Sequence, residues 1–257
     1  MKKLLVTLIA LMGVGAAGLA FANGGAAGIS AIQSPHNFAD NWCGGVAAGG
    51  GQLCSAVVPP IVETDGSGGG WNVREEICRV CHVPHDHNQT TNAYWSAGLL
   101  WNHAAPTTAT WTPYDSGSMD ATVGDPSGPS LLCLGCHDGS TALDTFDKYA
   151  GGSIDIADYN AGYQVPATGT AGDLSGTHPL SMSYYDDGNM NPDTTPMGTS
   201  GTIANVLFGD TAAQTATVEC SSCHDVHDQN SVINTHLLRV LNNGANPSGL
   251  CLTCHDK

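Results

Sequence analysis

The sequence has few of the residues that build an ordinary hydrophobic core. Aromatic residues make up 6% of the 257 residues and charged residues 12%, whereas glycine occupies 33 positions. Much of the apolar content is alanine, which buries little area per residue when a chain folds. The chain therefore needs something besides its own side chains to pack around.

Basic residues are also scarce. Seven Lys and Arg stand against 23 Asp and Glu, giving a formal net charge of −16. This charge argues against nucleic acid and anionic membrane surfaces as partners, because both are negatively charged. Solubility alone accounts for the acidity equally well.

Long hydrophobic runs are missing except near the N-terminus. Two lysines precede an apolar run over residues 4–19, which is short for a membrane span, and residues 20–22 form an A-x-A cleavage signal. We predict a signal peptide over residues 1–22, export, and no membrane span after cleavage. A retained membrane anchor is the alternative.

Cysteine is abundant, and eight of the ten cysteines fall into four copies of the pattern C-x-x-C-H. The cysteines are Cys78, Cys81, Cys133, Cys136, Cys220, Cys223, Cys251 and Cys254, and the histidines are His82, His137, His224 and His255. This is the attachment signal of c-type haem. Two cysteines three apart can both reach the vinyl groups on one haem edge, and the next imidazole can bind iron from the proximal side. We predict four covalently bound c-type haems.

Zinc ribbons and thioredoxin-like redox pairs also use C-x-x-C. Neither requires a histidine directly after the second cysteine, and chance seldom places one there in four cases out of four. An exported compartment also suits covalent haem. The pattern favours haem attachment.

The motifs alternate between two kinds. The first and third are followed by a second histidine, His85 and His227, whereas Pro-Ser-x-Leu precedes the second and fourth. This order predicts a duplicated two-haem unit, over residues 78–138 and 220–256, within one domain over residues 23–257.

His85 and His227 lie three residues after a proximal histidine, so the intervening chain spans at most about 10–11 Å. Such a side chain can hardly reach the opposite face of the same haem. If it binds iron, it binds the iron of a neighbouring haem. The alternative is a hydrogen bond to a propionate.

Seven histidines lie outside the motifs, which exceeds the four that would give every iron a second axial histidine. They are His36, His85, His87, His103, His178, His227 and His236. Methionine ligands, which raise the reduction potential of the haem, are the alternative. The candidates are Met119, Met182, Met190 and Met197.

The sequence resembles the bacterial multihaem cytochromes with a doubled CxxCH motif. The resemblance is carried by residues 34–37, 78–85, 100–102, 132–139, 177–181, 220–227 and 250–255. A chain of this size with four motifs is also similar to the tetrahaem subunits of extracellular cytochrome filaments. That resemblance implies haems with two axial histidines, stacked in a row, one of which takes a histidine from an adjacent copy.

The positions that match the distal ligands of that family are His36, His85, His178 and His227. His103 and His236 are reserve candidates, and His87 is the weakest. His36 lies near the expected start of the mature chain, where it could reach another copy. Ligation in trans and ligation within the chain are the two hypotheses.

Cys43 and Cys54 belong to no motif and flank a glycine-rich segment. In an exported protein we expect them to form a disulfide. Free thiols and a bridge to another chain are the alternatives.

The expected fold is a multihaem cytochrome c, mostly loop with short α-helices wrapped around a stacked row of four haems, and little β structure. Residues 65–70, 104–129 and 186–201 are predicted to be loops. Short helices are expected at the motifs, and residues 232–241 are the best additional helix.

These features predict an electron carrier and not an enzyme. The resemblance implies an extracellular or cell-surface homopolymer, a conductive filament that exchanges electrons with redox partner cytochromes or extracellular acceptors. A monomeric periplasmic shuttle is the alternative. A multihaem reductase would need one iron with an open position, which the surplus of histidines argues against.

The covalent haem load can be measured by intact-mass analysis of the purified, processed protein. We expect the mass to exceed that of the polypeptide by four haems, because eight sulfurs are consumed in thioether links. Bound zinc or free motif thiols in that analysis would contradict the assignment.

Overall fold

The computed structural model describes residues 28–30, 34–38, 76–83, 101–146, 154–159, 161–166, 170–185, 188–232 and 236–256. Several predictions fall on other parts of the chain. The signal peptide, the expected disulfide between Cys43 and Cys54, and the candidate ligands His85 and His87 lie outside the described residues.

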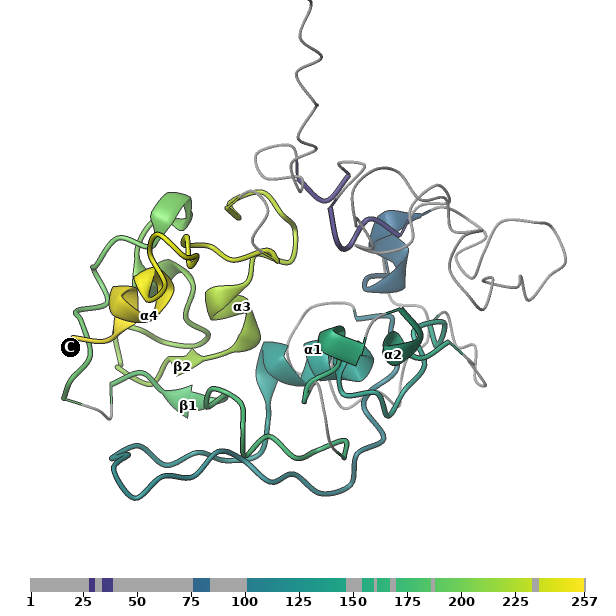
Figure 1. The fold of residues 1–257 in the computed structure, drawn as a ribbon, viewed down its shortest axis with the longest axis horizontal. Helices are drawn as coiled ribbons and strands as arrows, with labels where there is room; N and C mark the ends of the chain where they lie inside the picture. The colour runs from purple at the N-terminus through teal and green to yellow at the C-terminus, as the bar shows by residue number, and fades with distance from the viewer. Residues whose placement is uncertain are drawn as a thin grey trace, which may run out of the picture.

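The described chain is mostly loop, with short helices and little sheet (Figure 1). Its α-helices are α1 (Gly128–His137), α2 (Ile156–Tyr159), α3 (Cys220–Cys223) and α4 (Gly249–Cys254). Its 3-10 helices are η3 (Ile77–Val80), η5 (Ala161–Tyr163), η6 (Gly198–Ser200) and η7 (Ile203–Asn205). The strands β1 (Met182–Ser183) and β2 (Thr217–Val218) pair antiparallel, with Met182 opposite Val218. This part of the expected fold is confirmed.

Each of the four motifs lies on a short helix, as predicted, but the two kinds of motif differ in form. The second lies on α1, which begins five residues before Cys133, and the fourth on α4, which begins two residues before Cys251. Pro129 in the first turn of α1 explains this start, because proline suits a position whose N–H has no helical partner. The first and third lie on the four-residue helices η3 and α3.

Two sequence predictions need correction. The loop expected over residues 104–129 ends at Ser127, because α1 begins at Gly128. The helix expected over residues 232–241 is absent from its described part, where residues 236–240 form turns and bends. His236 and Leu237 have φ values of 55° and 65°, which no right-handed helix contains. Leu238 instead forms an isolated antiparallel bridge with His224.

The buried apolar side chains are dispersed in small groups. One group combines Tyr184, Ile203 and Val218, with Met182 and Met190 packed against it. Leu132 and Leu134 are buried on α1. Clusters of this size bury too little apolar area to order long loops by themselves. None of the helices in the described ranges has the length and apolarity that crossing a bilayer requires.

Helices α1 and α3 pack against each other, with α4 beyond α3 (Figure 1). On its other side α1 touches the segment that follows Trp101. A Cβ atom at Gly135 would lie 2.8 Å from the carbonyl oxygen of Ala104 and 3.5 Å from Nδ1 of His103. Glycine at this position therefore permits the close approach of two backbones.

Substitution Gly135→Ala should destabilise the protein by about 1–3 kcal/mol, because backbone on both sides must shift to accept the added methyl group. Thermal unfolding of the haem-loaded protein measures the change. Gly124→Ala is the matched control, since a Cβ atom there meets nothing within 4 Å. Equal unfolding temperatures for the two variants would show that the close contact is unimportant.

Candidate haem sites

The motif cysteines form a continuous series through the molecule, and none of the eight is in a disulfide. Electrostatic or hydrogen-bonding interactions join cysteines of successive motifs. They include those of Cys81 with Cys136, Cys133 with Cys220, and Cys223 with Cys254. The motifs therefore follow one another in space in the order in which they occur in the sequence.

Burial raises the pKa of most of these thiols. It raises the pKa of Cys136 to about 12, with the charge of Asp138 adding to the effect, and that of Cys254 to about 11. A hydrogen bond with Cys220, together with burial, raises the pKa of Cys133. A reactive redox dithiol needs a lowered pKa that favours the thiolate. Most of these motifs thus lack the electrostatics of a thioredoxin-like pair.

Three motif histidines each face a histidine from a distant segment. The ring centroids of His82 and His227 are 6.3 Å apart. Those of His137 and His36 are 6.2 Å apart, as are those of His255 and His178. Every histidine–histidine ring contact seen among the described residues joins one motif histidine to one predicted distal ligand.

These separations fit two axial ligands on one iron. An imidazole nitrogen binds a first-row metal at about 2.0–2.1 Å and the ring centroid lies about 1 Å behind it, so two rings on opposite sides have centroids about 6 Å apart. Ordinary packing of aromatic rings also gives centroid separations of about 4.5–7 Å, so the distance alone does not distinguish axial ligation from packing. The selective pairing of proximal with predicted distal histidines favours ligation.

Four of the motif and predicted distal histidines donate a hydrogen bond from Nδ1, the ring nitrogen not needed for iron, to a backbone carbonyl. Nδ1 of His36 lies 3.2 Å from the oxygen of Val226, and Nδ1 of His137 lies 2.7 Å from that of Tyr163. The same contact joins His178 to Pro179 at 2.9 Å and His224 to His236 at 2.9 Å. Donation from Nδ1–H to a carbonyl leaves Nε2 as a free electron-pair donor, and it orients the ring.

Burial also keeps three of these imidazoles, those of His36, His137 and His224, in the neutral, ligating form. Burial and the neighbouring His137 together lower the pKa of His36 to about 4. Burial likewise lowers the pKa of His137 and of His224. Because only a neutral imidazole can donate an electron pair to a metal, these surroundings suit axial ligands.

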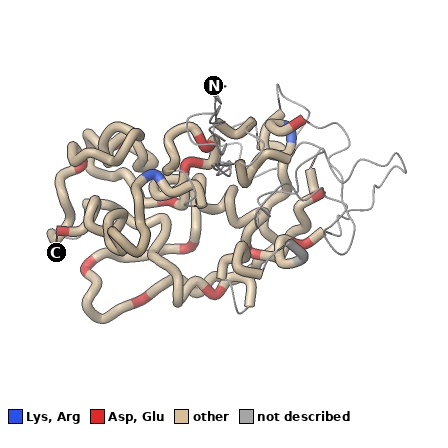
Figure 2. Tube along the Cα trace, turned by 45° about the horizontal axis from the view of Figure 1, so that its top comes forward, with Lys and Arg blue, Asp and Glu red and all other residues tan. Residues whose placement is uncertain are grey.

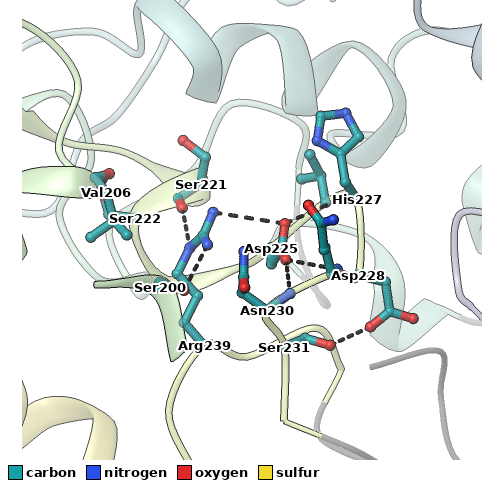
Figure 3. A network of polar contacts seen from close by, with 12 residues as sticks. Ser200, Val206, Ser221, Ser222, Asp225, His227, Asp228, Asn230, Ser231 and Arg239 are labelled. Atoms are coloured by element: carbon teal, nitrogen blue, oxygen red, sulfur yellow. Dashed lines mark hydrogen bonds and ion pairs between the residues drawn. The ribbon is translucent and has the colours of Figure 1, made fainter. Parts of the chain in front are cut away.

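The loop that carries His227 is held by Asp225, which is buried. Its carboxylate accepts hydrogen bonds from the backbone N–H groups of His227 at 3.3 Å, Gln229 at 2.8 Å and Asn230. Arg239 pairs with the same carboxylate at 3.9 Å. Figure 3 shows this network, with the imidazole of His227 pointing away from it. His227 consequently faces His82, and not His224 in its own motif.

The reserve candidates have other roles in the structure. His103 is fully buried, with Nδ1 2.9 Å from the oxygen of Ala104 and Nε2 3.2 Å from that of Leu143, so its neutral ring donates its one N–H to a backbone carbonyl and both ring nitrogens face carbonyl oxygens. His236 contributes its carbonyl to His224. The candidate methionines Met182 and Met190 pack against the group around Tyr184, and Met197 is buried.

His224 is the motif histidine for which the described residues supply no facing imidazole. Its Nδ1 contact with His236 prepares it for iron in the same way as His137. His85, its possible partner by the repeat, lies outside the described residues.

Several participating groups were not identified from the sequence. The carbonyl groups that orient the histidines belong to Val226, Tyr163, Pro179 and His236, and a backbone atom leaves no signal in residue identity. Asp225 could have been noticed, because the third motif has Asp where the first has Val83. Among the described residues, no three His, Cys, Asp or Glu side chains gather as ligands of a single ion.

Residues 213–257 match the family model described as the doubled CXXCH motif. The match spans the third and fourth motifs, together with α3 and α4. Comparison with curated proteins and with solved structures gave no match. The matched motif implies covalently bound c-type haem, and with the paired histidines it supports a multihaem c-type cytochrome.

Proposed function

We propose that the protein is a tetrahaem electron carrier in which two histidines bind each iron. The observation that carries this proposal is the set of three facing pairs, His82 with His227, His137 with His36, and His255 with His178. Four attachment motifs that follow one another in space give a row of sites along which electrons can pass. Haem, when bound, supplies the reversible Fe(III)/Fe(II) couple.

The residues of the chain perform three tasks in this function. The cysteines attach each haem covalently, so that the occupancy of its site in the row does not depend on the concentration of free haem. Histidines on both faces occupy the positions at which a substrate would otherwise bind, which favours electron transfer over catalysis. The backbone carbonyls at Nδ1 orient the rings and leave Nε2 for iron, whereas burial favours the neutral form of His36, His137 and His224.

Pairing between motifs also couples the first and third sites, which are not successive in the cysteine series. His227 belongs to the third motif yet faces His82 of the first. One iron would therefore be held by two motifs, which ties the spacing of their haems to the fold of the 220–228 segment. Fast electron transfer between haems depends on such fixed, short spacing.

The placement of His36 bears on assembly. His36 faces His137 of its own chain, which supports the intrachain hypothesis over ligation in trans. A conductive filament remains a prediction drawn from the resemblance and would need other contacts between copies. The monomeric shuttle needs none.

The haem-loaded protein tests the function directly. We expect electron paramagnetic resonance of the oxidised protein to show low-spin ferric haem only, because histidines fill both axial positions. Electrochemical titration should show complete, reversible reduction. A high-spin fraction in the wild-type protein would favour a reductase, and irreversible reduction would argue against a carrier.

Substitution His178→Ala should convert one haem to a high-spin, five-coordinate form, because His255 then loses its facing imidazole. The same resonance spectrum measures the fraction. His236→Asn is the control: it removes an imidazole but keeps the carbonyl that orients His224, and asparagine tolerates the positive φ. High-spin haem in the control and none in His178→Ala would reverse the assignment.

A further inference from the structure

Glu219 is a carboxylate enclosed by protein, directly before the third motif. Its side chain is 1% exposed. Oε2 accepts hydrogen bonds from Oγ of Ser130 and, at 3.1 Å, from Oγ of Ser181, and Oε1 accepts one at 2.6 Å from Oγ1 of Thr217. Bound haem can only add to this burial.

The hydrogen-bond pattern shows that Glu219 acts as an acceptor. Oγ of Ser130 already accepts the N–H of Cys220 at 3.0 Å, and Oγ of Ser181 accepts the N–H of Ser127 at 2.8 Å. Each hydroxyl therefore directs its hydrogen to the carboxylate. An ionised carboxylate is acceptor-only, so the two serine donors suit the charged form, as does Thr217 when its one hydrogen follows the shorter of its contacts, 2.6 Å to Glu219 and 3.2 Å to the carbonyl of Phe208.

The same contacts join two attachment helices. Ser130 lies on α1 and Glu219 precedes α3, so their hydrogen bond connects the second motif to the third. The side chains of Cys133, from the second motif, and Cys220, from the third, lie next to each other beside it. Glu219 thus lies where the second and third attachment sites meet.

The described cations are engaged elsewhere. Arg79 pairs with Glu76 at 3.4 Å and Arg239 with Asp225 at 3.9 Å. Among the described residues of Figure 2, acidic positions outnumber these two basic ones. Within the described ranges, the charge of Glu219 is therefore moderated by hydroxyl dipoles and by no opposite charge. In a low-dielectric interior such a charge acts strongly on its neighbours.

We propose that Glu219 lowers the reduction potential of the haem attached through Cys220 and positions that site against the second motif. The proposal rests on the proposed function. Reduction of a ferric haem removes one positive charge, so a fixed negative charge nearby favours the oxidised form. Glu219 is a positioning and tuning residue and does not touch iron.

The test is electrochemical titration of the haem-loaded wild-type protein and the variant Glu219→Gln, with the electrode as electron source. We expect at least one midpoint potential to move to a more positive value in Glu219→Gln. The shift should persist at high salt, because salt screens buried charges poorly. The matched control is Glu76→Gln, which loses the same charge before the first motif from a side chain that is 48% exposed. A smaller, salt-sensitive shift is expected there.

Glu219→Asp separates charge from geometry. It keeps the charge on a shorter side chain, so its potentials should match the wild-type values while its unfolding temperature falls. A shift in Glu219→Asp as large as that in Glu219→Gln would overturn the role of charge. If Glu219→Gln fails to load haem, a midpoint potential in Glu219→Asp that is clearly more positive than the wild-type value would overturn it. Wild-type potentials in Glu219→Gln would overturn the proposal and leave the electron-carrier function intact. Wild-type protein that lacks reversible reduction would instead refute that function.

Discussion

Facing pairs of imidazole rings are the constraint on which the rest of this structure depends. Each of the three pairs joins segments that are far apart in the chain: His36 with His137, His82 with His227, and His178 with His255. Regular elements are short and the apolar groups are small, so secondary structure and core packing supply few long-range restraints. The need to bring two rings to a fixed separation supplies them instead.

Much of the polar structure can be understood as support for these rings. Backbone carbonyls take the Nδ1 protons of His36, His137, His178 and His224, which selects one tautomer and one orientation. Such partners commonly fix metal-binding histidines. A backbone carbonyl serves this purpose without introducing a charge, which suits a site whose potential depends on nearby charge.

Buried carboxylates next to the attachment motifs are a second recurring feature of the structure. Asp138, Glu219 and Asp225 are all buried and all lie within one residue of a motif. Asp225 arranges the loop of His227, and Glu219 joins α1 to α3. Burying a carboxylate is costly unless it is hydrogen bonded, and each of these accepts several hydrogen bonds. Their charges add a negative field along the series of attachment sites.

The sequence by itself determined the chemistry of the sites. Thioether attachment depends on two cysteines and a histidine within five consecutive residues, so local spacing is sufficient to identify it. The same local information predicted the short helices at the motifs. It also predicted that His227 cannot serve the haem of His224, because the intervening chain is too short.

Only the tertiary structure decided which histidines face each other. His36, His103 and His178 are equivalent as residue types, but His103 is enclosed by the carbonyls of Ala104 and Leu143, whereas the other two reach motif histidines. The helix expected near residue 236 is also absent because of a tertiary contact. The backbone of His236 turns there, and its carbonyl oxygen accepts a hydrogen bond from His224. Partner choice across long separations depends on how the chain closes on itself, and no local pattern contains that information.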